Sequence, residues 1–158
     1  MSKTGVFLLL LLYGVLQAQI PAYSLSYNKS ANPYKDLEKA LKQAKKEHKK
    51  VLLIVGGDWC KWCGQLENFL DDHQNVKDEL YKHFEVVKVY YARDMNKEAK
   101  SLLSQFPKVE ETPFFYVLND KAKLLNVAKS SSFERGFSYN TKKFLNFIKN
   151  NSGEKDEK

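Results

Sequence analysis

The sequence contains only two cysteines, Cys60 and Cys63, among its 158 residues. A scaffold stapled by disulfides is therefore excluded, because one pair three positions apart cannot brace distant segments. Glycine and proline are also few, at 7 and 4 residues, and neither an internal repeat nor a long linker is present. The length suits one domain of roughly 100–200 residues. Its stability must come from a hydrophobic core.

Arginine is nearly absent, since Arg93 and Arg135 are the only two. The 26 basic and 19 acidic residues nevertheless give a net charge of +7, which can indicate a nucleic acid or an anionic membrane as partner. The lysines are spread along the chain, and the densest runs, Lys45-Lys46 and Lys49-Lys50, fit a solvated helix face. Without an arginine cluster, a nucleic-acid partner is disfavoured.

An apolar run long enough to span a membrane is also missing. The run from Val6 to Leu16 has 11 residues, whereas a spanning helix needs about 20. Its length and the preceding Lys3 are typical of a secretory signal peptide, with a buried N-terminal helix as the alternative. We expect residues 1–24 to be this signal, cleaved near Ala18 or Ser24, and the mature protein to be exported. No cysteine follows the run, so a lipoprotein anchor is excluded.

The remaining chain alternates helical and strand patterns. Apolar residues at helical spacing predict helices that begin at Asn32-Pro33, cover 60–70, 76–81 and 94–105, and begin again at Asn140 or Thr141. Apolar and β-branched runs predict strands over 51–55, 84–91, 114–118 and 124–128, with a polar loop at 71–75. This alternation favours a small α/β sandwich over residues 25–151, followed by a polar tail at 152–158.

One motif carries chemistry. Trp59-Cys60-Lys61-Trp62-Cys63 follows a predicted buried strand and opens a predicted helix. A cysteine at a helix N-terminus faces unpaired N–H groups and the positive end of the helix dipole, which favour the nucleophilic thiolate. Cys63 lies one turn later on the same side and can close a disulfide. We therefore expect Cys60 to be the attacking, more exposed thiol and Cys63 the buried resolving thiol.

Three other roles for the pair are less favoured. A structural zinc needs four ligands, but the remaining candidates, His48, His73 and His83, are not paired at ligand spacing. Covalent haem attachment needs His at position 64, which is Gly64. An inert structural disulfide would close too short a loop to constrain the unfolded chain much. We expect no metal, and no cofactor other than the redox-active disulfide itself.

Over residues 32–150 this arrangement resembles the thioredoxin-like superfamily. Thr112-Pro113, just before an aromatic strand, matches the cis-proline loop of that family. The resemblance implies a central mixed sheet of about four to five strands flanked by helices. It implies further that Pro113 packs beside the disulfide and that Thr112 offers backbone hydrogen bonds to an extended substrate. Trp59 also matches the family motif and is expected to form a surface platform.

Two departures from the family pattern stand out. Lys61-Trp62 replaces the Gly-Pro that thioredoxins carry between the cysteines, and Trp62 is expected to shield the disulfide. Ile54 stands where thioredoxins place a buried Asp, so the usual proton acceptor for the resolving thiol is missing. Three residues are candidate replacements, although a surface charge is the favoured interpretation of each: Asp58, Glu67 and Lys88.

With its signal peptide, the chain looks like an envelope thiol–disulfide oxidoreductase of the Dsb type. Lys61 should favour the thiolate and thus an oxidant, whereas Trp62 is similar to DsbH-like reductases and favours a reductase. The prediction is a monomeric, periplasmic reductase of disulfides in exported proteins, recharged by a membrane electron donor. A disulfide oxidase, an isomerase and a non-enzymatic thioredoxin-like chaperone or adaptor remain alternatives. The C-terminus resembles an endoplasmic-reticulum retention signal but lacks its final Leu.

Overall fold

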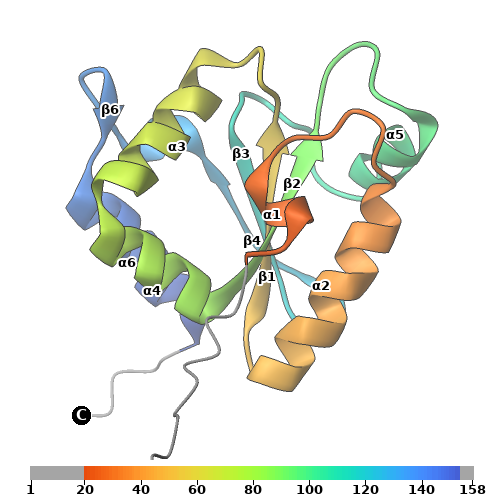
Figure 1. The fold of residues 1–158 in the computed structure, drawn as a ribbon, viewed down its shortest axis with the longest axis horizontal. Helices are drawn as coiled ribbons and strands as arrows, with labels where there is room; N and C mark the ends of the chain where they lie inside the picture. The colour runs from red at the N-terminus through yellow and green to blue at the C-terminus, as the bar shows by residue number, and fades with distance from the viewer. Residues whose placement is uncertain (1–19, 154–158) are drawn as a thin grey trace, which may run out of the picture.

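The computed structural model describes residues 20–153, and its centre is a four-stranded mixed sheet (Figure 1). The strands are β1 (Lys50–Gly56), β2 (Phe84–Tyr90), β3 (Phe114–Leu118) and β4 (Leu124–Lys129), in the order β2-β1-β3-β4. β1 runs parallel to β2 and antiparallel to β3, and β3 forms an antiparallel hairpin with β4. The predicted α/β architecture is confirmed.

Helices cover both faces of this sheet. On one face lie α3 (Lys61–Asp72), α4 (Gln74–His83) and α6 (Thr141–Ser152), and on the other lie α2 (Pro33–Glu47) and α5 (Lys97–Leu103) (Figure 1). The apolar run of β1 supplies both cores, because alternate side chains point to opposite faces of a strand. Leu52 and Ile54 join the α3 side, whereas Val51, Leu53 and Val55 join the α2 side.

The helix starts at Asn32-Pro33 and Asn140 are confirmed. The Asn32 side chain accepts a hydrogen bond from the Tyr34 amide, and Pro33 occupies the first turn, where its missing N–H costs nothing. The Asn140 side chain accepts from the Lys143 amide in the same way. These caps fix where α2 and α6 leave the preceding loops.

Two predicted boundaries are wrong. The loop expected at 71–75 shrinks to His73, because α3 continues to Asp72 and α4 begins at Gln74. The helix expected from Asp94 begins at Lys97, because Asn96 is the cap and accepts from the Ala99 amide at 2.8 Å. Asp94 instead pairs with Lys29 of the N-terminal segment.

That N-terminal segment is part of the fold. A short helix, α1 (Ala22–Leu25), packs against β2, and the buried Ser24 hydroxyl donates to the Val86 carbonyl. Of the predicted signal peptide, residues 1–19 lie outside the described residues, as do residues 154–158 of the predicted tail; Ser152 ends α6. Within 20–153 no helix is both long and apolar enough to cross a membrane.

A second small sheet, not predicted, follows β4. A 3-10 turn, η1 (Ser130–Ser132), leads into a hairpin of β5 (Glu134–Arg135) and β6 (Ser138–Tyr139). Gly136 lies in its turn with φ of +62°, a backbone conformation that glycine adopts without steric cost. The hairpin packs beside α3 (Figure 1), so it borders the helix that carries the cysteines.

Candidate active site

Cys60 and Cys63 form a disulfide where β1 ends and α3 begins, with their Cα atoms 5.2 Å apart. Cys60 is the N-cap of α3, and its Sγ accepts a hydrogen bond from the Cys63 amide at 3.1 Å. The sulfur therefore occupies the position at which a helix N-terminus offers unpaired N–H groups to a negative charge. A thiolate formed at Cys60 would be stabilised there.

Both cysteine residues are buried, Cys63 more deeply than Cys60. Cys60 is 6% exposed and Cys63 is 2% exposed. Cys63 lies on the apolar stripe of α3 with Leu66, Phe69 and Leu70, which faces the core. An attacking partner would therefore reach Cys60 before Cys63.

The loop before β3 lies directly beside the disulfide. The Thr112-Pro113 peptide bond is cis, as the family resemblance implies, and the Thr112 carbonyl oxygen is 3.4 Å from Cys60 Sγ. This proximity follows from the sheet, because β3 pairs antiparallel with β1 and Phe114 lies opposite Val55. The start of β3 and the end of β1 therefore lie next to each other at the same end of the sheet.

The two tryptophans of the motif have different surroundings. Trp59 is 57% exposed; its indole N–H donates to the Tyr91 carbonyl at 3.1 Å, and the ring fills the space that a β-carbon at Gly57 would need. Trp62 is half-buried against the Tyr139 ring, whose centroid is 5.5 Å away, and its carbonyl accepts from the Tyr139 hydroxyl at 3.1 Å. Of these two tryptophans, only Trp59 has an exposed side chain.

The hairpin adds an aromatic residue that sequence reasoning missed. Phe137 at its tip is 84% exposed, and the Lys61 amino group lies 6.0 Å from the centre of its ring. The alternation of Phe133, Phe137 and Tyr139 around Gly136 was the available signal. It is too short a pattern to distinguish a hairpin from a loop.

A family model described as thioredoxin-like matches residues 32–119. The chain belongs to the thioredoxin-like family. It is also similar to solved structures of Dsb-type proteins. One is a disulphide isomerase from Xylella fastidiosa Temecula1, with 26% identity, a TM-score of 0.62 and coverage of 78% of this chain and 94% of that one.

Two further solved structures share the fold at 20% identity. The C-terminal domain of DsbD from Neisseria meningitidis, in the oxidised form, has a TM-score of 0.53 and covers 75% of this chain and 95% of that one. A DsbH oxidoreductase has a TM-score of 0.52 and covers 89% of this chain and 94% of that one. A comparison with curated proteins finds no match.

Behind the disulfide this thioredoxin-like protein departs from the family pattern. Ile54 pairs in register with Lys88 of β2, whose side chain is 4% exposed. The Lys88 amino group lies 2.8 Å from Glu67 Oε2 and donates to the Leu25 carbonyl at 2.9 Å. The interpretation of Lys88 as a surface charge is therefore wrong, because pairing with Glu67 and Leu25 allows its burial. Asp58 is exposed, as that interpretation expects.

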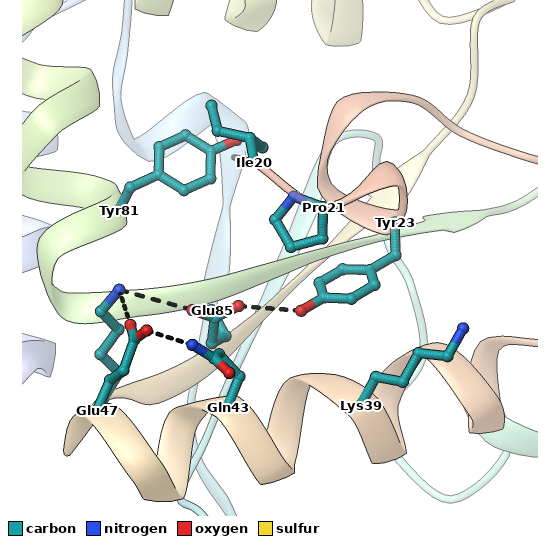
Figure 2. A pocket seen from close by; sticks show the side chains of 9 residues that line it. Ile20, Pro21, Tyr23, Lys39, Gln43, Glu47, Tyr81 and Glu85 are labelled. Carbon is teal, nitrogen blue, oxygen red and sulfur yellow. Dashed lines mark hydrogen bonds and ion pairs between the residues drawn. The ribbon is translucent and has the colours of Figure 1, made fainter. Parts of the chain in front are cut away.

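A cavity lies away from the disulfide. It measures about 520 Å³ and opens near the start of β1 and β2, between α1, α2 and α4 (Figure 2). Part of its charge is paired within the wall: Glu85 accepts from the Tyr23 hydroxyl at 3.0 Å and lies 3.6 Å from the Lys49 amino group. Burial and Glu85 raise the pKa of Tyr23 above its usual value. Among residues 20–153 no cluster of His, Cys, Asp and Glu is arranged to hold a metal ion.

Proposed function

We propose that this protein is an exported thiol–disulfide oxidoreductase that reduces disulfides in other proteins through Cys60 and Cys63. The observation that carries the proposal is the position of Cys60 as the cap of α3, with its sulfur 3.4 Å from the Thr112 carbonyl. Membership of the thioredoxin-like family and the 26% identity to a disulphide isomerase support disulfide chemistry.

The reductive reaction needs no cofactor. The Cys60 thiolate attacks one sulfur of a substrate disulfide and forms a mixed disulfide with it; the substrate S–S bond breaks, and the other substrate sulfur leaves as a thiolate and takes a proton. Cys63 then loses its proton, and its thiolate attacks Cys60 Sγ. The enzyme disulfide forms, and the second substrate thiolate leaves and is protonated. Two electrons pass from the enzyme dithiol to the substrate, so a donor must reduce the enzyme again.

The surface around Cys60 suits a polypeptide substrate. Trp59 and Phe137 are the most exposed aromatic side chains in residues 20–153, and both lie on segments that border the cysteine motif. Rigid aromatic side chains provide much of the binding energy at protein interfaces. Lys61 adds a positive charge. We propose that the substrate is an extended segment with apolar or acidic residues near its cystine.

The proposed reductive direction rests on the likeness of Trp62 to DsbH-like reductases. The competing direction has one observation in its favour, because Lys61 and the α3 N-terminus both stabilise a thiolate at Cys60, which makes a disulfide more oxidising. Equilibration with glutathione distinguishes them. A reductase should lie near the value of about −270 mV that is typical of thioredoxin, whereas a value near about −120 mV would make the protein an oxidase.

The apolar run at residues 6–16 supports export, and the likeness to DsbD and DsbH supports partners of the Dsb type. We propose that a signal peptide directs the chain to the periplasm, that it acts there as a monomer, and that a membrane protein supplies electrons. Cleavage after Ala18 is favoured over cleavage after Ser24, since α1 and the buried Ser24 pack against β2. The intact mass of the exported protein tests this directly. A mature chain that begins at Leu25 would contradict it.

Trapping tests the catalytic proposal. A Cys63→Ser variant should accumulate mixed disulfides with exported proteins through Cys60, because the resolving sulfur is gone. A Cys60→Ser variant is the matched control and should trap nothing. If wild-type protein fails to reduce insulin and Cys63→Ser traps no partner, the protein is a binding module instead of an enzyme.

A further inference from the structure

A cleft of about 180 Å³ lies behind Cys63, on the side away from the Thr112 loop. The N-terminal segment, β2 and α3 form its walls, and its lining includes Tyr27, Cys63, Glu67 and Lys88. A water molecule takes about 30 Å³ in the liquid, so the cleft has room for several. It offers the buried sulfur a second polar environment besides the disulfide surface.

Tyr27 places a hydroxyl beside Cys63. A β-carbon at Gly56 would collide with Cys63 Sγ and would lie 3.1 Å from the Tyr27 hydroxyl oxygen. The Cys63 sulfur and the Tyr27 hydroxyl therefore both lie close to Gly56, at the end of β1. The Tyr27 hydroxyl is buried and has no hydrogen-bond partner among residues 20–153. A buried hydroxyl without a partner costs free energy, so its retention calls for an explanation.

Glu67 and Lys88 place a charge pair in the same cleft. Glu67 Oε2 pairs with the Lys88 amino group at 2.8 Å, whereas Glu67 Oε1 is buried without a hydrogen-bond partner in the described chain. The Lys88 amino group also lies 5.7 Å from the centre of the Tyr27 ring. Burial, and then the Glu67 charge, hold the pKa of Tyr27 well above its usual value, so the hydroxyl keeps its proton.

We propose that the Tyr27 hydroxyl donates a hydrogen bond to the Cys63 sulfur when the disulfide opens, and that the free oxygen of Glu67 accepts the Cys63 proton. This inference rests on the proposed thiol–disulfide exchange. Tyr27 and Glu67 would together replace the strand acid that Ile54 displaces. Tyr27 lies before residues 32–119, so the donor comes from a segment that the family model does not match.

The step balances as follows. In the mixed disulfide between Cys60 and a substrate, Cys63 is a free thiol; its proton passes to Glu67, directly or through water in the cleft. The Cys63 thiolate, held by the Tyr27 hydroxyl, then attacks Cys60 Sγ and displaces the substrate thiolate. That thiolate is protonated by solvent, and Glu67 returns its proton through the open cleft.

The test uses the full mature protein and Tyr27→Phe, which keeps the ring and removes the hydroxyl. Resolution of the mixed disulfide is followed by rapid mixing of reduced enzyme with a cystine-containing peptide. We expect this step to slow by about tenfold to a hundredfold, the range for a lost hydrogen bond to a charged group. The first attack by Cys60 should keep its rate. Tyr116→Phe, which removes a buried hydroxyl on the other face of the sheet, should leave both steps unchanged.

A second measurement separates hydrogen bonding from packing. In a Cys60→Ser background, the thiolate absorbance of Cys63 is titrated with and without Tyr27→Phe and Glu67→Gln. The charged and titratable groups around this sulfur are Asp58, Glu67, Lys88 and Tyr139, besides Tyr27. Tyr27→Phe should raise the Cys63 pKa. Glu67→Gln should slow resolution but lower that pKa, because it removes a nearby negative charge.

The outcomes are distinct. If wild-type protein exchanges disulfides but Tyr27→Phe resolves them at the wild-type rate with an unchanged Cys63 pKa, the Tyr27 proposal is overturned and the proposed function stands. If wild-type protein performs no exchange, the proposed function itself fails. A Tyr27→Phe effect on stability that is equal in the oxidised and reduced proteins would identify a packing role and would also overturn the proposal.

Discussion

Cys60 Sγ and the Thr112 carbonyl oxygen lie 3.4 Å apart although the residues are 52 positions apart in sequence. In the proposed reaction, this backbone carbonyl accepts a hydrogen bond from an extended substrate peptide that approaches along the Thr112 loop. Such contacts bind the substrate backbone without regard to its sequence. Side-chain preferences would then come from the exposed residues around the loop, Trp59 and Phe137.

Phe137 tests the polypeptide substrate. Phe137→Ser should raise KM for a disulfide-bonded protein by about fivefold to thirtyfold, because an exposed aromatic contact at an interface contributes about 1–2 kcal/mol. The rate with a small disulfide such as oxidised glutathione should not change, since it reaches only Cys60. Steady-state kinetics with both substrates measure the split.

The matched control for Phe137 is Leu125→Ser. Leu125 is an exposed apolar residue near the start of β4, at the opposite end of the sheet from the disulfide. It should leave both KM values unchanged. Equal losses with protein and small substrates in Phe137→Ser would mean that the hairpin supports the structure of the site and does not bind substrate.

Alanine substitutions at two glycines near the cysteines should have opposite effects on the free energy of unfolding. A β-carbon at Gly56 would collide with Cys63 Sγ, so Gly56→Ala should lower the free energy of unfolding by about 1–3 kcal/mol. A β-carbon at Gly64 would meet nothing within 4 Å, so Gly64→Ala in α3 should raise it by up to about 1 kcal/mol. Urea denaturation of the oxidised protein measures both. A neutral Gly56→Ala would show that Cys63 and Tyr27 move apart freely.

The fold, the C-x-x-C motif and the Thr112-Pro113 loop could be predicted from the sequence because the signal for each lies within a few adjacent residues. The run Val51–Val55, the caps Asn32 and Asn140, and the C-x-x-C spacing each depend on a few adjacent residues. The cysteine pair and the Thr112-Pro113 loop could be linked only through the family resemblance, which implied their contact.

The cleft behind Cys63 could not be predicted, because segments distant in the sequence come together to form it. Tyr27, Glu67 and Lys88 share no motif, and each alone looks like an ordinary polar residue. Lys88 lies in an apolar strand, yet nothing in the sequence states that Glu67 and the Leu25 carbonyl will pair with it. The predicted signal peptide ends at residue 24 and the first predicted helix begins at Asn32-Pro33, so no predicted element contains Leu25 or Tyr27.

The Lys88–Glu67 pair predicts a stability effect. Lys88→Met keeps the length of the side chain but leaves Glu67 and the Leu25 carbonyl without their cation. We expect the free energy of unfolding to fall by about 1–3 kcal/mol, below the full penalty for a buried pair because the Glu67 side chain is 41% exposed. The control is Lys42→Met, which breaks an exposed helical pair with Glu38 and should leave the free energy of unfolding nearly unchanged. Equal effects would show that burial of Lys88 contributes nothing.

Buried tyrosines predict a loss of stability at high pH. Burial raises the pKa of both Tyr81 and Tyr116 to about 12, and it also raises the pKa of Tyr27 and of Tyr139 well above the usual value. An unfolded tyrosine ionises near pH 10. Between these values the unfolded chain binds fewer protons than the native protein, so the free energy of unfolding falls as pH rises. The stabilisation is fully present below about pH 10 and is lost progressively between about pH 10 and 12.

Urea denaturation at a series of pH values from 8 to about 11.5 measures this fall, and absorbance at 295 nm follows tyrosine ionisation. Each such tyrosine should contribute a slope approaching about 1.4 kcal/mol per pH unit above pH 10. Tyr81→Phe isolates one contribution from the lysines that titrate in the same range. In this variant the free energy of unfolding should fall less steeply with pH than in the wild-type protein, and the difference should equal the contribution of one such tyrosine. Identical slopes would show that Tyr81 ionises equally easily in the folded and unfolded chains.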